Sequence, residues 1–231
     1  MTKKCPRALI FDLDGTLADT LPQLAKAARA ACEACGITPP DYDTARSYVG
    51  NGVWMLLERC ILGRRDITQG TADRDLLVKT RRAFNQAYMK GLSSDYTIFP
   101  GVKEGLETFH KAGIRLGVCT NKPQMFAIPL LKCMGLSPLF DFILGGEVLK
   151  RRKPDPSPVL YTCGRLGVWP DEAMMVGDSE NDVLGGSNAG LTSVFMTYGY
   201  YTGKKEDISP DMSFDSFGDF TSYVMGTGAQ D

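Results

Sequence analysis

Two aspartates separated by one leucine follow an apolar run near the start of the chain. The sequence reads LIFDLDGT from Leu9 to Thr16, so Asp12 and Asp14 come directly after residues that look buried. Carboxylates are costly to remove from water unless something compensates their charge. Side chains two positions apart on an extended chain point to the same side, so both carboxylates can approach one site. Gly15 then permits a tight turn and the close approach of a ligand.

A second pair of acids follows another apolar run. In the stretch GDSEND at 177–182, Asp178 and Asp182 are four positions apart, which is one turn if a helix begins there. Four carboxylates beyond strand ends would repel one another unless a cation joins them. Hard oxygen ligands without a thiolate or imidazole cluster favour Mg²⁺, which typically uses one or two protein carboxylates together with substrate phosphate. The sequence therefore predicts a magnesium site.

Donors for a phosphate group are also present. Thr120, Asn121 and Lys122 follow the apolar run IRLGVC and offer a hydroxyl, an amide and backbone N–H groups at an expected helix start. Lys153, in the stretch KPDP, offers an ammonium group on a loop stiffened by proline. Acids and a metal combined with a hydroxyl and a lysine indicate phosphoryl transfer.

The elements that must position these residues alternate along the chain. Short apolar runs predict strands, and helix-length segments lie between the later ones. The predicted strands are 7–12, 114–119, 140–144, 173–176 and 192–196, and two of the helices are 103–112 and 123–134. This alternation predicts an α/β fold with a parallel sheet and right-handed crossovers. Ligands bind beyond the carboxyl ends of such strands, where the aspartates are expected.

The interval 18–97 interrupts this alternation. It contains helical patterns at 21–35, 54–62 and 76–89, and it predicts an all-helical insert after the first strand. We therefore expect a core domain made of residues 1–17 and 98–225, a helical domain at 18–97, and a frayed tail at 226–231. The two tryptophans, Trp54 and Trp169, are expected to pack in the interior.

Composition excludes several classes of protein. The chain has 231 residues, with 26 Lys and Arg against 27 Asp and Glu, so no basic excess favours nucleic acid as a partner. No apolar run reaches the roughly 18 residues of a membrane span. Seven cysteines are scattered along the chain, which fits reduced thiols better than a disulfide framework. We expect a cytoplasmic protein, a monomer or a homodimer, that binds neither nucleic acid nor membranes.

Together these motifs resemble the haloacid dehalogenase superfamily, whose signature is four short motifs in fixed order. Here they are DLDGT at 12–16, the hydroxyl residue Thr120, Lys153 in KPDP, and GDSEND at 177–182. The resemblance covers nearly the whole chain. It implies a Rossmann-like parallel sheet with helices on both faces and identifies the insert at 18–97 as the family's helical cap domain.

The resemblance also implies a role for each acid at the first strand. Asp12 would be the nucleophile and would form an aspartyl-phosphate. Asp14 would protonate the leaving oxygen and then activate the water that hydrolyses this intermediate. Asp12, the backbone carbonyl of Asp14, and Asp178 would hold Mg²⁺.

The remaining motif residues would act on the phosphoryl group. By the same resemblance, Thr120 and Lys153 would bind the phosphoryl oxygens, and we add Asn121 to this phosphate-binding set. Asp182 would help to position the metal or the lysine. Neutralisation of the phosphate charge by metal and lysine is what allows a carboxylate to attack.

Three further stretches narrow the resemblance to bacterial phosphoglycolate phosphatases. They are LADT at 17–20, VGNGV at 49–53 and FPGV at 99–102. We expect a small anionic phosphorylated metabolite as substrate, with 2-phosphoglycolate converted to glycolate and phosphate. The GNG stretch can open a helix whose N–H groups face an anion, so Asn51 and Gly52 are the expected substrate contacts in the cap.

Other functions remain open at this point. They include a phosphatase for another small phosphorylated metabolite, an inorganic pyrophosphatase, and a phosphomutase similar to β-phosphoglucomutase. A phosphomutase would use Asp12 in the same way but would protect the phosphoenzyme from water. A non-catalytic phosphate-binding module is the alternative from another class, although none of the expected acids is missing from the sequence.

Overall fold

The structure is a computed structural model that describes residues 5–201, 203 and 208–226. The chain forms two compact units. The core unit comprises Met1–Asp19 and Ile98–Asp231, and the helical unit comprises Thr20–Thr97. The chain passes between them through β2 (Ala18–Asp19) and β3 (Thr97–Ile98), which pair with each other. Of the predicted tail at 226–231, all but Gly226 lies outside the described residues.

The core unit contains a six-stranded sheet in the order β5-β4-β1-β6-β7-β8. All neighbouring strands run parallel. The four residues of β1 are fully buried, as expected for a central strand covered on both faces. The strands are β1 (Ala8–Phe11), β4 (Arg115–Pro123), β5 (Phe142–Gly146), β6 (Ala173–Gly177), β7 (Thr192–Met196) and β8 (Met212–Phe214). The predicted parallel α/β sheet is confirmed.

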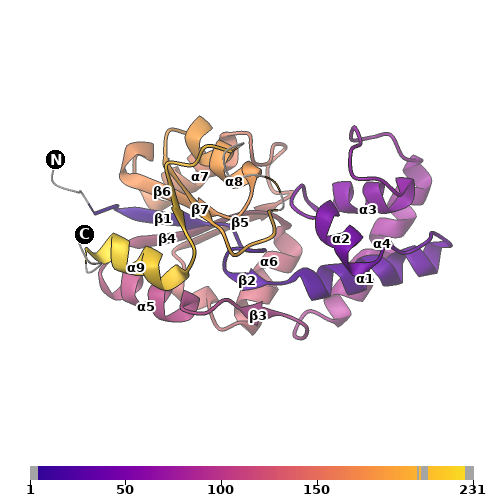
Figure 1. Cartoon of the computed structure of the whole chain (residues 1–231), viewed down its shortest axis with the longest axis horizontal. Helices are drawn as coiled ribbons and strands as arrows, with labels where there is room; N and C mark the ends of the chain where they lie inside the picture. Colours follow the sequence, from indigo (N-terminus) through magenta and orange to yellow (C-terminus); the bar gives the residue numbers. More distant parts are fainter. Residues whose placement is uncertain (1–4, 202, 204–207, 227–231) are drawn as a thin grey trace. The chain divides into compact units, whose positions relative to one another are not determined.

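Helices cover both faces of this sheet (Figure 1). Ile10 of β1 packs in one apolar cluster with Val159 and Leu166 of α7. The next residue, Phe11, stacks on Phe217 of α9 with ring centroids 5.8 Å apart. Successive strand side chains point to opposite faces, so β1 is covered from both sides, as predicted. The core helices are α5 (Val102–Lys111), α6 (Gln124–Cys133), α7 (Ser157–Leu166), α8 (Glu180–Asn188) and α9 (Phe217–Met225), with 3₁₀ turns η1 (Ser137–Leu139) and η2 (Pro170–Glu172).

The helical unit is built from helices with clear sequence signals at their ends. α1 stops at Gly36, whose φ of 72° is the left-handed conformation that ends many helices. α4 starts behind Asp73, whose carboxylate accepts a hydrogen bond from the Leu76 N–H at 2.8 Å. The helices are α1 (Leu21–Cys35), α2 (Tyr42–Tyr48), α3 (Val53–Leu62) and α4 (Arg74–Lys90). The role of this unit as a cap stays a prediction.

Some predicted boundaries are wrong. The strand expected to end at 119 continues to Pro123, after a shift in register beyond Cys119. Thr120 therefore lies in a strand and not at a helix start, and the helix that follows begins at Gln124, one residue after its predicted start. The strand expected at 140–144 begins two residues later, at Phe142. The weakly apolar strand β8 and the short helix α2 were not predicted.

Two further observations concern surface and membrane. Trp169 is 74% exposed, so the expectation that it packs in the interior is wrong. Its backbone instead caps the short turn η2, because the Trp169 N–H donates to Glu172 Oε2 at 3.0 Å. Among the described residues, no helix combines the length and the apolar character that crossing a bilayer requires.

Candidate active site

Three adjacent strands bring the predicted site residues to one edge of the sheet. Asp12 follows β1, Thr120 lies in the last part of β4, and Asp178 follows β6. Both β4 and β6 pair with β1 in parallel, so their carboxyl ends share an edge. The Asp12 N–H donates to the carbonyl of Val176 at 2.9 Å, which extends the ladder to the site itself. β4 and β6 lie on opposite sides of β1 in the sheet. Parallel α/β sheets bind ligands beyond the carboxyl ends of strands at such a position.

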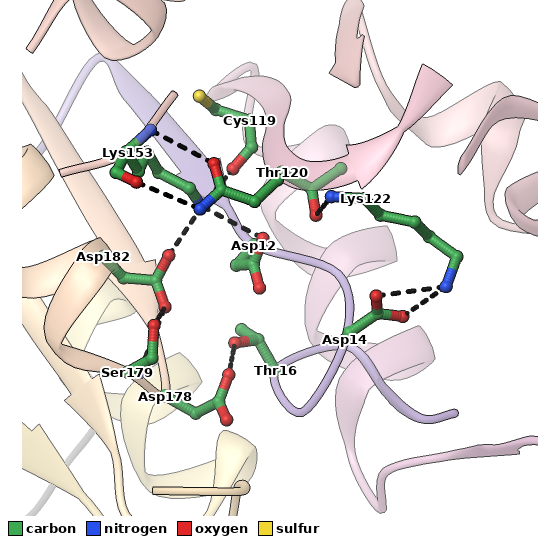
Figure 2. Close-up of polar contacts among 11 residues, drawn as sticks. Asp12, Asp14, Thr16, Cys119, Thr120, Lys122, Lys153, Asp178, Ser179 and Asp182 are labelled. Atoms are coloured by element: carbon green, nitrogen blue, oxygen red, sulfur yellow. Dashed lines mark hydrogen bonds and ion pairs between the residues drawn. The ribbon is translucent and has the colours of Figure 1, made fainter. Parts of the chain in front are cut away.

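A buried lysine lies between two of the acids (Figure 2). The Nζ of Lys153 donates to Asp12 Oδ1 at 3.0 Å, to Asp182 Oδ1 at 2.6 Å, and to the carbonyl of Cys119. Only 1% of its side chain is exposed. Although burial acts in the opposite direction, the carboxylates of Asp12 and Asp182 raise the pKa of Lys153 above its ordinary value. The ammonium group therefore stays charged at neutral pH.

Asn121 fixes the loop that carries this lysine. Its Nδ2 donates to the carbonyl of Lys153 at 3.1 Å, and its Oδ1 accepts from the Lys153 N–H at 3.1 Å. Next to it, the nearly buried Thr120 hydroxyl accepts from the Lys122 N–H at 3.2 Å. The Thr120 hydroxyl also lowers the pKa of Asp12, as the smallest of several effects. Asn121 thus orients the lysine, while its contact with phosphate stays a prediction.

Asp178 has a hydrogen-bond donor on each of its oxygens. The hydroxyl of Thr16 donates to Oδ1 and the Tyr200 N–H donates to Oδ2, both at 2.7 Å. Gly15, with a φ of 85°, lies so close that a Cβ atom there would be 2.2 Å from Asp178 Oδ2. Burial, followed by the charges of Asp182 and Asp12, raises the pKa of Asp178 well above its usual range. Neutral donors orient this carboxylate without balancing its charge.

Asp182 links the lysine to the helix that follows β6. Its Oδ2 accepts from the N–H and the hydroxyl of Ser179 at 3.1 and 2.6 Å. This is a capping box at the start of α8, in which Ser179 is the N-cap. The other oxygen of Asp182 faces Lys153. The side chain is 1% exposed, so one buried carboxylate holds both the helix and the lysine.

Asp14 faces a different lysine. The Nζ of Lys122 donates to Oδ1 and Oδ2 of Asp14 at 2.8 and 3.0 Å. Only 1% of the Lys122 side chain and 14% of the Asp14 side chain are exposed. Figure 2 shows this pair beside the group formed by Asp12, Lys153 and Asp182. The two aspartates of the first motif thus have separate cationic partners.

Three carboxylates carry more negative charge than the lysine among them balances. One oxygen each of Asp12, Asp178 and Asp182 lies within 4.8 Å of the others. Lys153 supplies one positive charge, so two negative charges are left over when all three acids are ionised. Burial raises the pKa of Asp12 to about 6, against the opposing effect of Lys153. A divalent ion with a preference for oxygen would offset this excess, so the ligand set fits Mg²⁺.

The two residues predicted to contact substrate in the cap lie in the helical unit. Asn51 and Gly52 directly precede α3, and Gly52 is its N-cap. Gly50 and Gly52 have φ values of 111° and 81°, which favour glycine. The N–H groups of the first turn of α3 follow this loop. A contact between these residues and a substrate stays a prediction.

Four residues contribute contacts that the sequence did not predict. Thr16 lies inside the first motif, and Ser179 lies inside the last, but motif membership alone did not indicate their partners. Lys122 is two residues beyond Thr120, a spacing that places both side chains on one side of a strand. The backbone contact of Tyr200 carries no local signal, because any residue except proline has an N–H group.

The comparisons with known proteins agree with this geometry. The family model of haloacid dehalogenase-like hydrolases matches residues 9–196, a range that contains every acid and both lysines of the site. The chain belongs to this family. The resemblance predicted from the four motifs is therefore confirmed.

Relatives of this haloacid dehalogenase-like hydrolase carry a more specific name. A phosphoglycolate phosphatase of Psychrobacter arcticus is 38% identical and covers 94% of this chain and 95% of its own length. One from Chromobacterium violaceum is 40% identical over 87% of this chain and 89% of its own. The crystal structure of a predicted phosphoglycolate phosphatase from Haemophilus somnus has a TM-score of 0.88 and 32% identity, covering 96% of this chain and 99% of that one. The predicted resemblance to phosphoglycolate phosphatases is therefore confirmed, and so is the predicted enzyme class, phosphoric monoester hydrolase.

Proposed function

We propose that this haloacid dehalogenase-like hydrolase is a Mg²⁺-dependent phosphatase that converts 2-phosphoglycolate to glycolate and phosphate through an aspartyl-phosphate on Asp12. The observation that supports this most is the position of Asp12. Its carboxylate lies 3.0 Å from a buried ammonium group and belongs to a carboxylate cluster with excess negative charge. About 13% of its side chain remains exposed, so a substrate can reach it.

Asp12 is the nucleophile in this proposal. Its carboxylate oxygen attacks phosphorus, the bond from phosphorus to the leaving oxygen breaks, and a phosphoryl group is left on Asp12. Lys153 reduces the repulsion between the carboxylate and the phosphate dianion, and Thr120 donates to a phosphoryl oxygen. When bound by Asp12, Asp178 and the backbone carbonyl of Asp14, Mg²⁺ would supply the remaining charge neutralisation.

Asp14 transfers protons in both steps. In the first it gives a proton to the leaving glycolate oxygen, which would otherwise depart as an unstable alkoxide. That step leaves Asp14 deprotonated, so it can then take a proton from the water that attacks the aspartyl-phosphate. Water is consumed and phosphate is released, which restores Asp12. Asp182 keeps Lys153 in place through both steps.

The choice of 2-phosphoglycolate is supported by the names of the relatives and by the GNG stretch before α3. We infer that Asn51 and Gly52 bind the carboxylate of the substrate. The proposal also includes a cytoplasmic location and a small anionic phosphorylated metabolite as the partner. A monomeric or homodimeric state stays a prediction.

Phosphate release from a substrate panel tests the proposal. The panel contains 2-phosphoglycolate, glycerol 3-phosphate, glucose 1-phosphate and pyrophosphate, each with Mg²⁺ and with EDTA. We expect the highest kcat/KM for 2-phosphoglycolate, loss of turnover in EDTA, and a decrease of about 10³-fold or more for Asp12→Asn. Asp95→Asn is the matched control, since Asp95 forms an exposed ion pair with Lys26 in the helical unit.

Each other result has a defined meaning. Equal rates with Mg²⁺ and EDTA would contradict the metal requirement. Pyrophosphate as the best substrate would replace the proposal with a pyrophosphatase. Conversion of a sugar phosphate to its isomer without phosphate release would indicate a phosphomutase. Tight binding of 2-phosphoglycolate without turnover would indicate a binding module.

A further inference from the structure

Lys122 donates to both oxygens of Asp14, and this pair is almost fully enclosed. Two hydrogen bonds to one carboxylate fix the rotation of the group as well as its direction. The backbone on either side is also fixed, because the carbonyl of Leu13 accepts from the N–H groups of Thr16 and Leu17 at 3.4 and 3.0 Å. Asp14 therefore has a defined orientation in the absence of substrate.

The backbone of the lysine that provides this orientation is itself held in place. Lys122 lies in β4, and its backbone N–H donates to the Thr120 hydroxyl at 3.2 Å. A buried ammonium group must keep a partner, since an isolated buried charge is strongly unfavourable. The ammonium of Lys122 and the carboxylate of Asp14 thus hold each other in place. The cost of separating them keeps the pair together.

Each of the two aspartates of the first motif contacts a different lysine. Lys153 contacts Asp12 and Asp182, whereas Lys122 contacts Asp14 (Figure 2). A carboxylate two residues from the proposed metal ligand Asp12 would be attracted to the same cation when it is bound. A separate ammonium group opposes that attraction. It holds the Asp14 side chain beside the carboxylate cluster.

We propose that Lys122 is a positioning residue that directs the Asp14 carboxyl group toward the leaving oxygen. This inference rests on the proposed function, because Lys122 acts only through Asp14. During phosphoryl transfer one oxygen of Asp14 keeps its hydrogen bond to Lys122. The other oxygen carries the proton that Asp14 took from the attacking water in the preceding turnover. It moves from Lys122 to the leaving oxygen and gives it that proton.

The leaving group provides a specific test. Glycolate leaves as a poor alkoxide unless it is protonated, whereas p-nitrophenolate is stable without a proton. Loss of Asp14 function should therefore slow the hydrolysis of 2-phosphoglycolate far more than the hydrolysis of p-nitrophenyl phosphate. The ratio kcat/KM is the right quantity, since it covers the steps up to departure of the leaving group. A general loss of structure would slow both substrates alike.

The experiment compares Lys122→Met, Asp14→Asn and the double variant on both substrates in Mg²⁺. We expect Lys122→Met to lower kcat/KM about 10²-fold for 2-phosphoglycolate and less than about tenfold for p-nitrophenyl phosphate. Asp14→Asn should show the same pattern. The double variant should be no slower than Asp14→Asn alone, because both changes remove one function. Lys26→Met, which removes an exposed ion pair, should leave both substrates unaffected.

Two results would overturn the inference. Equal losses on both substrates for Lys122→Met would show a structural role, and multiplied losses in the double variant would show that Lys122 acts independently of Asp14, for example on the substrate. If Asp14→Asn itself shows no dependence on the leaving group, the acid role in the proposed function fails instead. If Lys122→Met does not fold, as judged by its thermal unfolding, Lys122→Gln replaces it in the same comparison.

Discussion

The hydroxyl of Thr16 donates to Asp178 Oδ1 at 2.7 Å, and this bond joins two residues 162 positions apart in the chain. It connects the loop after β1 with the loop after β6. The Tyr200 N–H donates a hydrogen bond to the other oxygen of Asp178, Oδ2, at 2.7 Å. A third segment, the loop after β7, thus also determines where this carboxylate lies. A proposed metal ligand whose position depends on three loops is sensitive to small changes in any of them.

Gly199→Ala should disturb the site through Asp178. A Cβ atom at Gly199 would lie 2.2 Å from the Cβ of Asp178, so one of the two must move. We expect kcat/KM to fall about 10²-fold, as misplacement of reacting groups by about 1 Å can do, and the Mg²⁺ concentration for half-maximal rate to rise. A Mg²⁺ titration of phosphatase activity measures both effects.

The matched control for this change is Gly164→Ala. Gly164 lies within α7, and a Cβ atom added there would meet no heavy atom within 4 Å beyond the neighbouring backbone of its own helix. We expect unchanged activity and a gain in unfolding free energy of up to about 1 kcal/mol, since alanine favours a helix over glycine. Wild-type activity and wild-type Mg²⁺ dependence in Gly199→Ala would show that the loop after β7 does not position Asp178.

The sequence predicted the parallel sheet because its central strands are short, buried and almost purely apolar. The run that contains Ala8 to Phe11 is one example. The apolar pattern could not predict that β4 continues through Asn121 to Pro123, because Asn121 is polar and proline lacks a backbone N–H donor. Their strand geometry depends on tertiary contacts, such as the two hydrogen bonds between Asn121 and Lys153.

The acids and Lys153 were predictable because their motifs follow apolar runs in a recognisable order. The hydrogen-bond and ion-pair partners of these residues were less predictable. The pair between Lys122 and Asp14 is separated by 108 positions, and the bond of Tyr200 to Asp178 uses a backbone N–H. Such contacts depend on how loops from different strands meet. A strand pattern fixes the shared edge of a sheet but not the side-chain pairs formed above it.

Magnesium should stabilise the folded protein through the carboxylate cluster. Binding to the folded state alone adds stability as RT ln(1 + [Mg²⁺]/Kd), which is about 2.7 kcal/mol at a concentration of 100 Kd. We expect the unfolding temperature to rise when Mg²⁺ is added after EDTA treatment. Asp178→Asn should lose most of this increase, whereas the exposed change Asp95→Asn should retain it. Equal shifts in both variants would place the ion elsewhere.

Asp14→Asn should accumulate the phosphorylated enzyme. With p-nitrophenyl phosphate the leaving group needs no proton, so Asp12 is still phosphorylated. Hydrolysis of the aspartyl-phosphate then lacks its base and becomes slower by about 10²-fold or more. Acid quenching during turnover, followed by mass spectrometry, should find phosphate on the peptide that contains Asp12. A smaller phosphorylated fraction in Asp14→Asn than in the wild type would contradict the second role of Asp14.

The metal-free protein should become less stable as pH rises, because the burial of Asp12 favours its neutral form. Burial raises the pKa of Asp12 from 3.8 to about 6, so the folded state holds this proton more tightly than the unfolded state. The contribution to stability is complete below pH 3.8 and is lost as pH rises through about 6. A difference of about two in pKa corresponds to at most about 3 kcal/mol. Urea unfolding in EDTA between about pH 4 and 7 measures this loss, and Asp12→Asn, which has no proton to release, should show less of it. The same pH dependence in both proteins would mean that Asp12 is no more costly to ionise in the folded state than in the unfolded chain.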